Sequence, residues 1–311
     1  MTLTTTTTRR FHPLFMSAGA SMLIVAGAFG PLAPALAEPR SEPPAPRTGT
    51  ARIVSLGGAL TETLFKLGVG GDVVATDTSS YRPAEAARLP KVGYHRALAA
   101  EGILALRPTL VLATDEAGPA TALDQLRAAG VTVTIIPAPS DATAARGFAT
   151  AVGEAVGRGE AGQALAATLT DGFATVDRRV AALGGRPRPK VLLIYARGPS
   201  VVNVAGPGTS ADAMIRLAGG VNAMTSPGFK PITAEAVIAA APDVVVMLAK
   251  GVESLGGAEP VWTLPGLAST PAARSRRLAV FDDQHLLGFG PTSAAAANEL
   301  FDALYPAGGV K

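Results

Sequence analysis

The feature that most constrains the fold of this 311-residue chain is an alternation of short apolar runs with helical segments. The runs RIVSL, DVVAT, PTLVLAT and VTVTIIP lie between residues 52 and 137, separated by segments with helical spacing. The alternation resumes at KVLLIYARG, continues through RLAVFD, and ends in the helical segment TSAAAANELFDALY. Short β-branched runs alternating with helices are typical of a parallel sheet covered on both faces. We therefore expect an α/β fold.

A long helical segment separates two sets of strands. Its apolar residues recur every three or four positions from Leu165 through Phe173 to Leu183, and Gly184 and Gly185 follow. The second set resembles the first, because EGILALRPTLVLAT aligns without gaps to EAVIAAAPDVVVML, and TLFKLGVGG resembles AMIRLAGGV. Convergence would explain either match alone. Two matches in the same order favour two similar lobes.

These patterns predict two Rossmann-like lobes with parallel sheets, joined by one long α-helix, with a ligand cleft between them. We assign residues 51–157 to the N-terminal lobe, 158–185 to the connecting helix and 186–311 to the C-terminal lobe. Open α/β sheets bind ligands at the carboxyl ends of their strands. In this arrangement those ends face each other across the cleft.

The N-terminal residues predict export. MTLTTTTTRR is basic, an apolar small-residue run follows, and Ala35-Leu36-Ala37 matches a signal peptidase site, so residues 1–37 read as a cleaved signal peptide. Arg9-Arg10 leaves both the general and the twin-arginine export routes open. Residues 38–50, EPRSEPPAPRTGT, read as a disordered proline-rich linker.

Charge and composition exclude several classes of protein. Loss of residues 1–37 removes two arginines and no acid, so 27 basic residues become 25 against 24 acids, and the net charge falls from +3 to +1. A nucleic-acid-binding protein needs a basic face to neutralise phosphates. The nearly equal numbers of basic and acidic residues in the mature chain argue against that class. It has no cysteine, so its stability depends on a packed core rather than on disulfides.

The chain also lacks the common enzyme motifs. GPGTS (206–210) does not complete a dinucleotide-binding fingerprint or a P-loop, and there is neither a Gly-x-Ser-x-Gly elbow nor a cysteine nucleophile. His95 and His285 are the only histidines after the signal peptide, which argues against a histidine-rich metal site but leaves a mixed His/Asp/Glu site open. We expect no enzymatic activity. An exported, two-lobed chain without catalytic motifs is typical of a solute-binding protein.

Several segments resemble one family in particular: RIVSLGGALTETLFKLG, LPKVGYHRALAAEGILALRPTLVLA, GTSADAMIRLAGGVNAM, FKPITAEAVIAAAPDVVVM and LPGLASTPAARSRRLAVFDDQHLLGFGP. Together, over about residues 51–305, they look like the periplasmic hemin-binding proteins of bacterial haem ABC importers. The resemblance implies a periplasmic monomer that carries haem b to an inner-membrane ABC permease dimer. The resemblance also makes an outer-membrane haem receptor pathway a candidate source of that haem.

The resemblance also implies a ligand for the iron. In the family, the tyrosine of Val-Gly-Tyr-x-Arg is the axial ligand of ferric haem, and this position is Tyr94. A phenolate suits hard ferric iron, although a free phenol has a pKa of about 10. In an extended loop Arg96 shares a face with Tyr94 and supports the phenolate, while His95 points away. A half-buried packing tyrosine is the alternative for Tyr94.

The opposite wall of the expected cleft is less well defined by the sequence. Tyr195 and Arg197 end the strand KVLLIYARG two residues apart, so both are candidates to face the ligand. Some relatives carry a histidine where this chain has Arg197, which puts a second iron ligand and a two-haem site in doubt. Arg197 and Lys230 are candidates for the haem propionates, with a solvated surface charge as the alternative for each. Phe289 in LLGFGP is a candidate for apolar contact with the porphyrin.

Glu101 and Glu235 occupy equivalent positions in the two matched segments. In the solute-binding class that the chain resembles, one surface glutamate per lobe docks into arginine pockets of the permease, and we expect this role for both residues. An acidic residue in the first turn of a helix is also favourable by itself. The main rivals to a haem carrier are a ferric-siderophore or cobalamin carrier of the same class, an exported enzyme, and an adaptor protein with an empty cleft.

Overall fold

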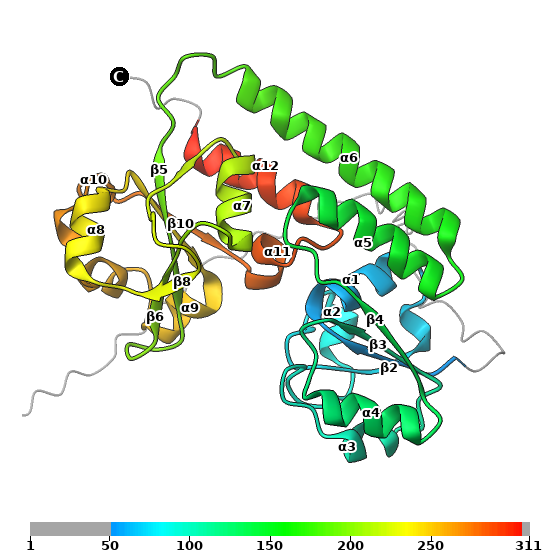
Figure 1. The fold of residues 1–311 in the computed structure, drawn as a ribbon. Helices are drawn as coiled ribbons and strands as arrows, with labels where there is room; N and C mark the ends of the chain where they lie inside the picture. Colours follow the sequence, from blue (N-terminus) through cyan, green and yellow to red (C-terminus); the bar gives the residue numbers. More distant parts are fainter. Residues whose placement is uncertain (1–50, 307–311) are drawn as a thin grey trace, which may run out of the picture. The chain divides into compact units, whose positions relative to one another are not determined.

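A computed structural model describes residues 51–306, which form two α/β lobes (Figure 1). The predicted signal peptide (1–37) and linker (38–50) lie outside the described residues. None of the helices between residues 51 and 306 combines the length and apolar character that a bilayer span requires. The lobe limits assigned from the sequence, 51–157 and 186–311, stay predictions.

The first lobe contains a four-stranded, fully parallel sheet in the order β2-β1-β3-β4. Its central strand β1 is buried along its whole length, which explains the nearly continuous apolar run in the sequence. The elements of this lobe are β1 (Ile53–Leu56), α1 (Gly58–Lys66), β2 (Val73–Thr76), α2 (Ala84–Ala87), α3 (Ala100–Leu104), β3 (Leu110–Thr114), α4 (Ala120–Ala128) and β4 (Thr132–Ile136), with a short 3₁₀ turn at Gly70–Asp72.

The second lobe contains a six-stranded sheet in the order β10-β9-β5-β6-β8, with β7 also paired to β5. Its strands are β5 (Lys190–Ala196), β6 (Val202–Ala205), β7 (Val221–Asn222), β8 (Phe229–Pro231), β9 (Val244–Leu248) and β10 (Leu278–Phe281). Its helices are α7 (Ser210–Leu217), α8 (Ala234–Ala240), α9 (Ala249–Ser254), α10 (Pro271–Arg274), α11 (Asp283–Leu287) and α12 (Ser293–Leu304), with 3₁₀ turns at Pro260–Thr263 and Leu267–Ser269.

The two-lobed α/β prediction is confirmed, with one difference in the second sheet. We expected parallel strands throughout, but β6 runs antiparallel to both β5 and β8. The cause is local. The Arg197 N–H donates to the Val201 carbonyl at 2.8 Å, which closes a tight hairpin between β5 and β6. A short hairpin can join only antiparallel strands, because a parallel pair needs a long crossover.

Two helices, α5 (Ala142–Ala155) and α6 (Gly159–Ala181), lie between the sheets in sequence and pack against each other (Figure 1). The sequence showed no break between residues 142 and 183, but Gly157 adopts a positive φ of 67° and separates the two helices. Helix α6 buries the predicted apolar face, Leu165, Leu169, Phe173 and Val176. Helix α12 packs along α6, so the C-terminal segment completes the core beneath it.

The matched segments of the two lobes share a backbone conformation as well as a sequence. Each forms a helix, a proline and a strand: α3, Pro108 and β3 in the first lobe, and α8, Pro242 and β9 in the second. The residue before each proline has a positive φ, 49° at Arg107 and 45° at Ala241. Non-glycine residues rarely adopt this conformation, so its recurrence strengthens the interpretation of the lobes as repeats.

A glutamine side chain links the lobes. The Gln284 amide nitrogen donates to the Gly58 carbonyl at 2.9 Å, and its backbone N–H donates to the Tyr81 hydroxyl at 3.0 Å. The buried carboxylate of Glu62 accepts from the same amide at 3.2 Å and from Thr292 at 3.2 Å. The hydrogen bonds between Gln284 and the first lobe can form only when α1 and α11 lie together.

Candidate functional site

A cavity of about 930 Å³ is lined by residues of both lobes. The parallel strands β1 to β4 of the first sheet and β5, β9 and β10 of the second point their carboxyl ends toward it, as predicted for an open α/β sheet, whereas β6 runs in the opposite direction. Its lining includes Gly57 and Gly58 after β1, Thr78 and Ser79 after β2, Asp115 and Glu116 after β3, residues 138–140 after β4, and Arg197, Lys250 and Asp283 after β5, β9 and β10.

Tyr94 lies in this lining with 45% of its surface exposed. The Ala97 N–H donates to the Tyr94 carbonyl at 2.8 Å, so residues 94–97 form a turn. The Tyr94 ring meets the edge of the His95 ring, with centroids 4.6 Å apart and planes at 65°. The turn therefore presents a large aromatic side chain to the cavity without burying it.

The turn corrects our expectation for His95. We assumed an extended loop, in which His95 would point away from Tyr94 and Arg96. Because residues 94–97 turn instead, all three side chains contribute to the same cavity lining. The His95 side chain is only 8% exposed.

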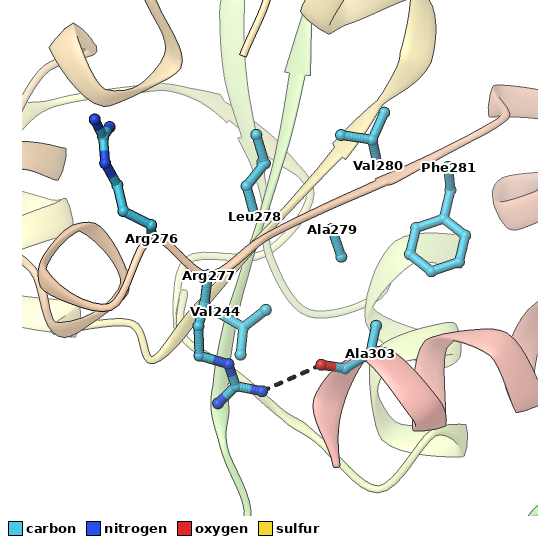
Figure 2. A pocket seen from close by; sticks show the side chains of 8 residues that line it. All are labelled: Val244, Arg276, Arg277, Leu278, Ala279, Val280, Phe281 and Ala303. Carbon is cyan, nitrogen blue, oxygen red and sulfur yellow. Dashed lines mark hydrogen bonds between the residues drawn. The ribbon is translucent and has the colours of Figure 1, made fainter. Parts of the chain in front are cut away.

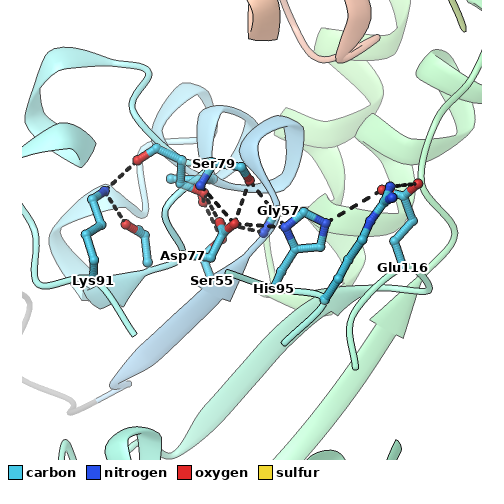
Figure 3. Close-up of polar contacts among 11 residues, drawn as sticks. Ser55, Gly57, Asp77, Ser79, Lys91, His95 and Glu116 are labelled. Carbon is cyan, nitrogen blue, oxygen red and sulfur yellow. Dashed lines mark hydrogen bonds and ion pairs between the residues drawn. The ribbon is translucent and has the colours of Figure 1, made fainter. Parts of the chain in front are cut away.

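His95 is held by a buried carboxylate. Its Nδ1 atom lies 2.9 Å from Asp77 Oδ2, and its Nε2 atom faces the Glu116 carboxylate at 3.8 Å (Figure 3). Nε2 is buried and has no hydrogen-bond partner within the described residues. The Asp77 carboxylate is fully buried beneath the Tyr94 turn, so the turn rests on a polar network rather than on apolar packing alone.

Asp77 gathers hydrogen bonds from three further residues. Its carboxylate accepts from the Gly57 N–H at 3.0 Å, the Ser79 hydroxyl at 2.6 Å and the Ser80 hydroxyl at 2.6 Å (Figure 3). Burial raises the pKa of Asp77, but the hydrogen bonds from His95, Ser79 and Ser80 outweigh it and lower the pKa to about 2. Asp77 is therefore a buried, ionised anchor for the loops after β1 and β2.

Arg96 lies in the cavity lining beside Tyr94 and donates to Glu116 Oε1 at 2.5 Å. This hydrogen bond raises the pKa of Arg96 against the opposing effect of burial, and Glu116, Tyr94 and Tyr195 raise it further through their charge. The structure thus brings Tyr94 and Arg96 together, as the sequence predicted. Arg96 and Glu116 are about half exposed, so their pairing contributes little to folding stability.

The second lobe places Tyr195 and Arg197 in the opposite wall, as their spacing on β5 predicted. The Arg197 guanidinium lies 4.4 Å from the Tyr195 ring centroid, and its Nη2 atom donates to Asp283 at 2.8 Å. Phe229 meets the Tyr195 ring edge-on at 5.9 Å between centroids. Sequence reasoning missed Phe229, because the three-residue strand β8 has no detectable period.

Two residues that the sequence predicted to contact the ligand, Phe289 and Lys230, lie outside the cavity lining. Phe289 adopts a positive φ of 46° and is fully buried in the core, so it is not part of the cavity lining, although Leu287 and Gly288 of the same segment are. Lys230 follows Phe229 on β8. Alternation along the strand puts Lys230 on the face opposite to Phe229, away from the lining.

Lys250 and Tyr81 belong to the lining, and the sequence did not single them out. The Lys250 Nζ atom lies 3.5 Å from the centroid of the Tyr81 ring. Burial raises the pKa of Tyr81, with smaller contributions from Asp282 and Asp283, so this phenol stays neutral. The position of Lys250 directly after β9 was a detectable signal, because residues at the carboxyl end of a parallel strand face the cleft.

The glutamates proposed for docking lie outside the cavity. Glu101 and Glu235 are exposed and occupy the first turns of α3 and α8, in keeping with their equivalent sequence positions. Neither is in an ion pair within residues 51–306. Each carboxylate is thus available at the surface of its own lobe.

A second hollow, of about 410 Å³, lies beside the edge strand β10 (Figure 2). Two arginines, Arg276 and Arg277, line it, and Arg277 donates to the Ala303 and Leu304 carbonyls at 3.1 and 2.8 Å. These carbonyls belong to the last turn of α12, where helical carbonyls lack partners of their own. Arg277 therefore caps a helix. In the described part of the chain, no cluster of three or more His, Asp or Glu side chains is arranged to hold a metal ion.

Comparison with known proteins identifies the class to which this fold and cavity belong. The chain is a member of the periplasmic binding protein family, whose model matches residues 53–285. Among curated relatives, the ABC transporter substrate-binding lipoprotein YvrC of Bacillus subtilis is 25% identical over 262 residues, covering 82% of this chain and 80% of the relative. The vitamin B12-binding protein of Vibrio parahaemolyticus is 35% identical over only 82 residues, or 26% of this chain and 30% of the relative.

Solved structures confirm the narrower resemblance to periplasmic hemin-binding proteins. The apo form of the periplasmic heme-binding protein RhuT from Roseiflexus sp. RS-1 is 45% identical with a TM-score of 0.79, covering 83% of this chain and 98% of that one. The periplasmic heme-binding protein BhuT, in complex with two hemes, is 44% identical with a TM-score of 0.78, covering 82% and 98%.

Proposed function

We propose that this chain is a periplasmic haem-binding protein, which carries haem b to an inner-membrane ABC importer without chemical turnover. The observation that carries the proposal is the half-exposed Tyr94 phenol, held at the wall of a two-lobed cavity beside a cation. A volume of about 930 Å³ lies within the usual range for small-molecule sites. The similarity to heme-binding proteins of known structure supports the same cargo.

In this proposal the Tyr94 phenolate coordinates ferric haem iron. An oxygen anion suits a hard ferric ion, and coordination replaces the phenol proton. Arg96 stabilises the phenolate, since its guanidinium lies in the same wall and remains charged. The buried pair of Asp77 and His95 holds the turn so that the Tyr94 oxygen meets the iron without a large rearrangement.

A hemin titration tests this assignment. The mature chain, Tyr94→Phe and the control Tyr305→Phe are titrated with hemin while the Soret region is recorded. Tyr305 is a matched control because its hydroxyl donates to the Gly219 carbonyl and lies outside the cavity lining. We expect saturable binding with high-spin ferric bands in wild type and Tyr305→Phe. Tyr94→Phe should lose those bands and bind at least about tenfold more weakly.

The same titration with cyanocobalamin and a ferric siderophore tests the rival cargoes. The match to a vitamin B12-binding protein, although it covers a quarter of the chain, makes cobalamin the rival to exclude. Saturable binding of cobalamin but not hemin, or a hemin spectrum unchanged by Tyr94→Phe, would contradict the proposal.

We further propose that the mature protein acts in the periplasm as a monomer and docks on its permease through Glu101 and Glu235. Both glutamates are exposed, and they occupy equivalent positions in the two lobes. In proteoliposomes with the cognate permease, the double variant Glu101→Ala/Glu235→Ala should abolish stimulated transport while hemin affinity is unchanged. Glu160→Ala, at an exposed glutamate in the first turn of α6, is the matched control and should transport normally.

A further inference from the structure

The cations of the cavity differ in their partners. Arg96 donates to Glu116 at 2.5 Å, and Arg197 donates to Asp283 at 2.8 Å. Lys250 also lies in the lining, but no carboxylate of residues 51–306 lies within 4.0 Å of its ammonium group. Each arginine therefore has a carboxylate partner, whereas the lysine has none within that distance in the described part of the chain.

The contact that Lys250 does make leaves its charge in place. The Nζ atom lies 3.5 Å from the Tyr81 ring centroid, a cation–π arrangement that positions an ammonium group without supplying a counter-charge. The Tyr81 hydroxyl in turn accepts from the Gln284 N–H at 3.0 Å, which fixes the ring at the junction of the lobes. An ammonium group has three donors, and the ring face leaves some of them directed to the cavity.

We propose that Lys250 binds a carboxylate of the cargo and makes the cavity select porphyrins with free carboxylates. The inference rests on the proposed function, in which the cargo is haem, whose two propionates are anionic. Arg96 and Arg197 each already have a carboxylate of the protein as counter-charge, which weakens their attraction for a carboxylate of the cargo. Lys250 has no such carboxylate partner among residues 51–306, so a propionate gains more from it than from either arginine.

This assignment also orients the cargo. The iron lies toward Tyr94 in the first lobe, and one propionate lies toward Lys250, in the first turn of α9 in the second lobe. The Tyr81 ring lies beneath Lys250 and belongs to the first lobe, so the propionate binds where side chains of both lobes meet. A porphyrin without free carboxylates keeps the iron contact and loses this one.

A comparison of two ligands tests the proposal. Hemin and hemin dimethyl ester, whose carboxylates are blocked, are titrated into wild type, Lys250→Met, Lys250→Arg and the control Lys230→Met. Lys230 is a matched control because it is an exposed lysine of the same lobe, on the opposite face of β8 from the cavity. We expect Lys250→Met to weaken hemin binding about tenfold, the loss of one charged hydrogen bond, and to leave ester binding unchanged.

The control variants separate this effect from a structural one. Lys250→Arg should retain the preference for hemin over its ester, Lys230→Met should behave as wild type, and the Soret bands of bound hemin should be the same in all four proteins. The proposal is wrong if Lys250→Met leaves hemin affinity unchanged, or if it weakens hemin and ester equally. Failure of the proposed function looks different, because wild type would then bind hemin without saturation or without dependence on Tyr94.

Discussion

Each lobe presents a tyrosine and an arginine two residues apart to the same cavity, but on different supports. Tyr94 and Arg96 lie on a turn above the buried pair of Asp77 and His95. Tyr195 and Arg197 lie at the end of β5, where the backbone ladder positions them. The strand needs no buried polar anchor, because its main-chain hydrogen bonds fix it. The turn has few such bonds and depends on the side-chain network.

The two tyrosines differ in what covers them. Tyr94 is 45% exposed and its ring touches His95 at one edge. The Tyr195 ring has the Arg197 guanidinium at 4.4 Å from its centroid and Phe229 at its edge. The same short sequence pattern thus produces an open phenol in one lobe and a covered one in the other. Accessibility, rather than residue type, separates a candidate ligand from a wall residue.

The largest loss of folding stability is expected from a change at Asp77, the buried anchor of the Tyr94 turn. Asp77→Asn replaces one acceptor oxygen with an amide that faces existing donors, including Ser79 and His95. We expect a loss of about 3 kcal/mol in the free energy of unfolding, measured by urea denaturation. The comparable change in the second lobe, Asp283→Asn, removes a pair with the exposed Arg197 and should cost at most about 1 kcal/mol. Equal losses would show that the two walls are supported alike.

The buried anchor of the Tyr94 turn should also make the folding stability of the protein sensitive to acid. The pKa of Asp77 falls from 3.8 to about 2 in the folded protein, so its ionised form favours folding. This contribution, roughly 2 kcal/mol, is fully present above pH 3.8 and is lost as the pH falls through about 2. Wild type should therefore lose more stability than Asp77→Asn between pH 5 and pH 2. A difference in the free energy of unfolding between wild type and Asp77→Asn that stays constant from pH 5 to pH 2 would contradict the assignment.

The smallest effect, on hemin affinity, is expected from a change at Tyr195, the tyrosine whose ring is covered by Arg197 and Phe229. Tyr195→Phe keeps the ring that contacts Arg197 and Phe229 and removes only the hydroxyl. We expect hemin affinity to change less than about threefold, with the Soret bands unchanged, in contrast to Tyr94→Phe. A loss of the high-spin bands in Tyr195→Phe would instead make the second lobe the source of the iron ligand.

Much of the fold could be predicted from the sequence, because it follows from local patterns. The strands around Val54, Val111 and Val246 read as apolar runs, and their alternation with helices indicated the α/β class. The spacing of Tyr195 and Arg197 on β5 placed both side chains on one face of a strand that does form. Patterns of this kind depend only on residues close in sequence.

The remaining features depend on contacts between distant segments. No local pattern pairs Asp77 with His95, eighteen residues later, or Gln284 with Gly58 in the other lobe. Lys230 was misplaced because the face it occupies is set by the register of β8 on β6. Phe289 was misplaced because its left-handed backbone directs the ring into the core, a conformation that sequence patterns do not predict for phenylalanine.

The charges of the cavity wall have a consequence for the speed of capture. The lining holds three basic side chains, Arg96, Arg197 and Lys250, and three acidic ones, Asp115, Glu116 and Asp283. Opposite charges in equal number produce little field at a distance, although each is strong at contact. The lining charges therefore add little long-range attraction for an anionic cargo, and we expect its association rate to depend mainly on diffusion and on fit at the cavity mouth. Ionic strength should then affect how long the cargo stays more than how quickly it arrives.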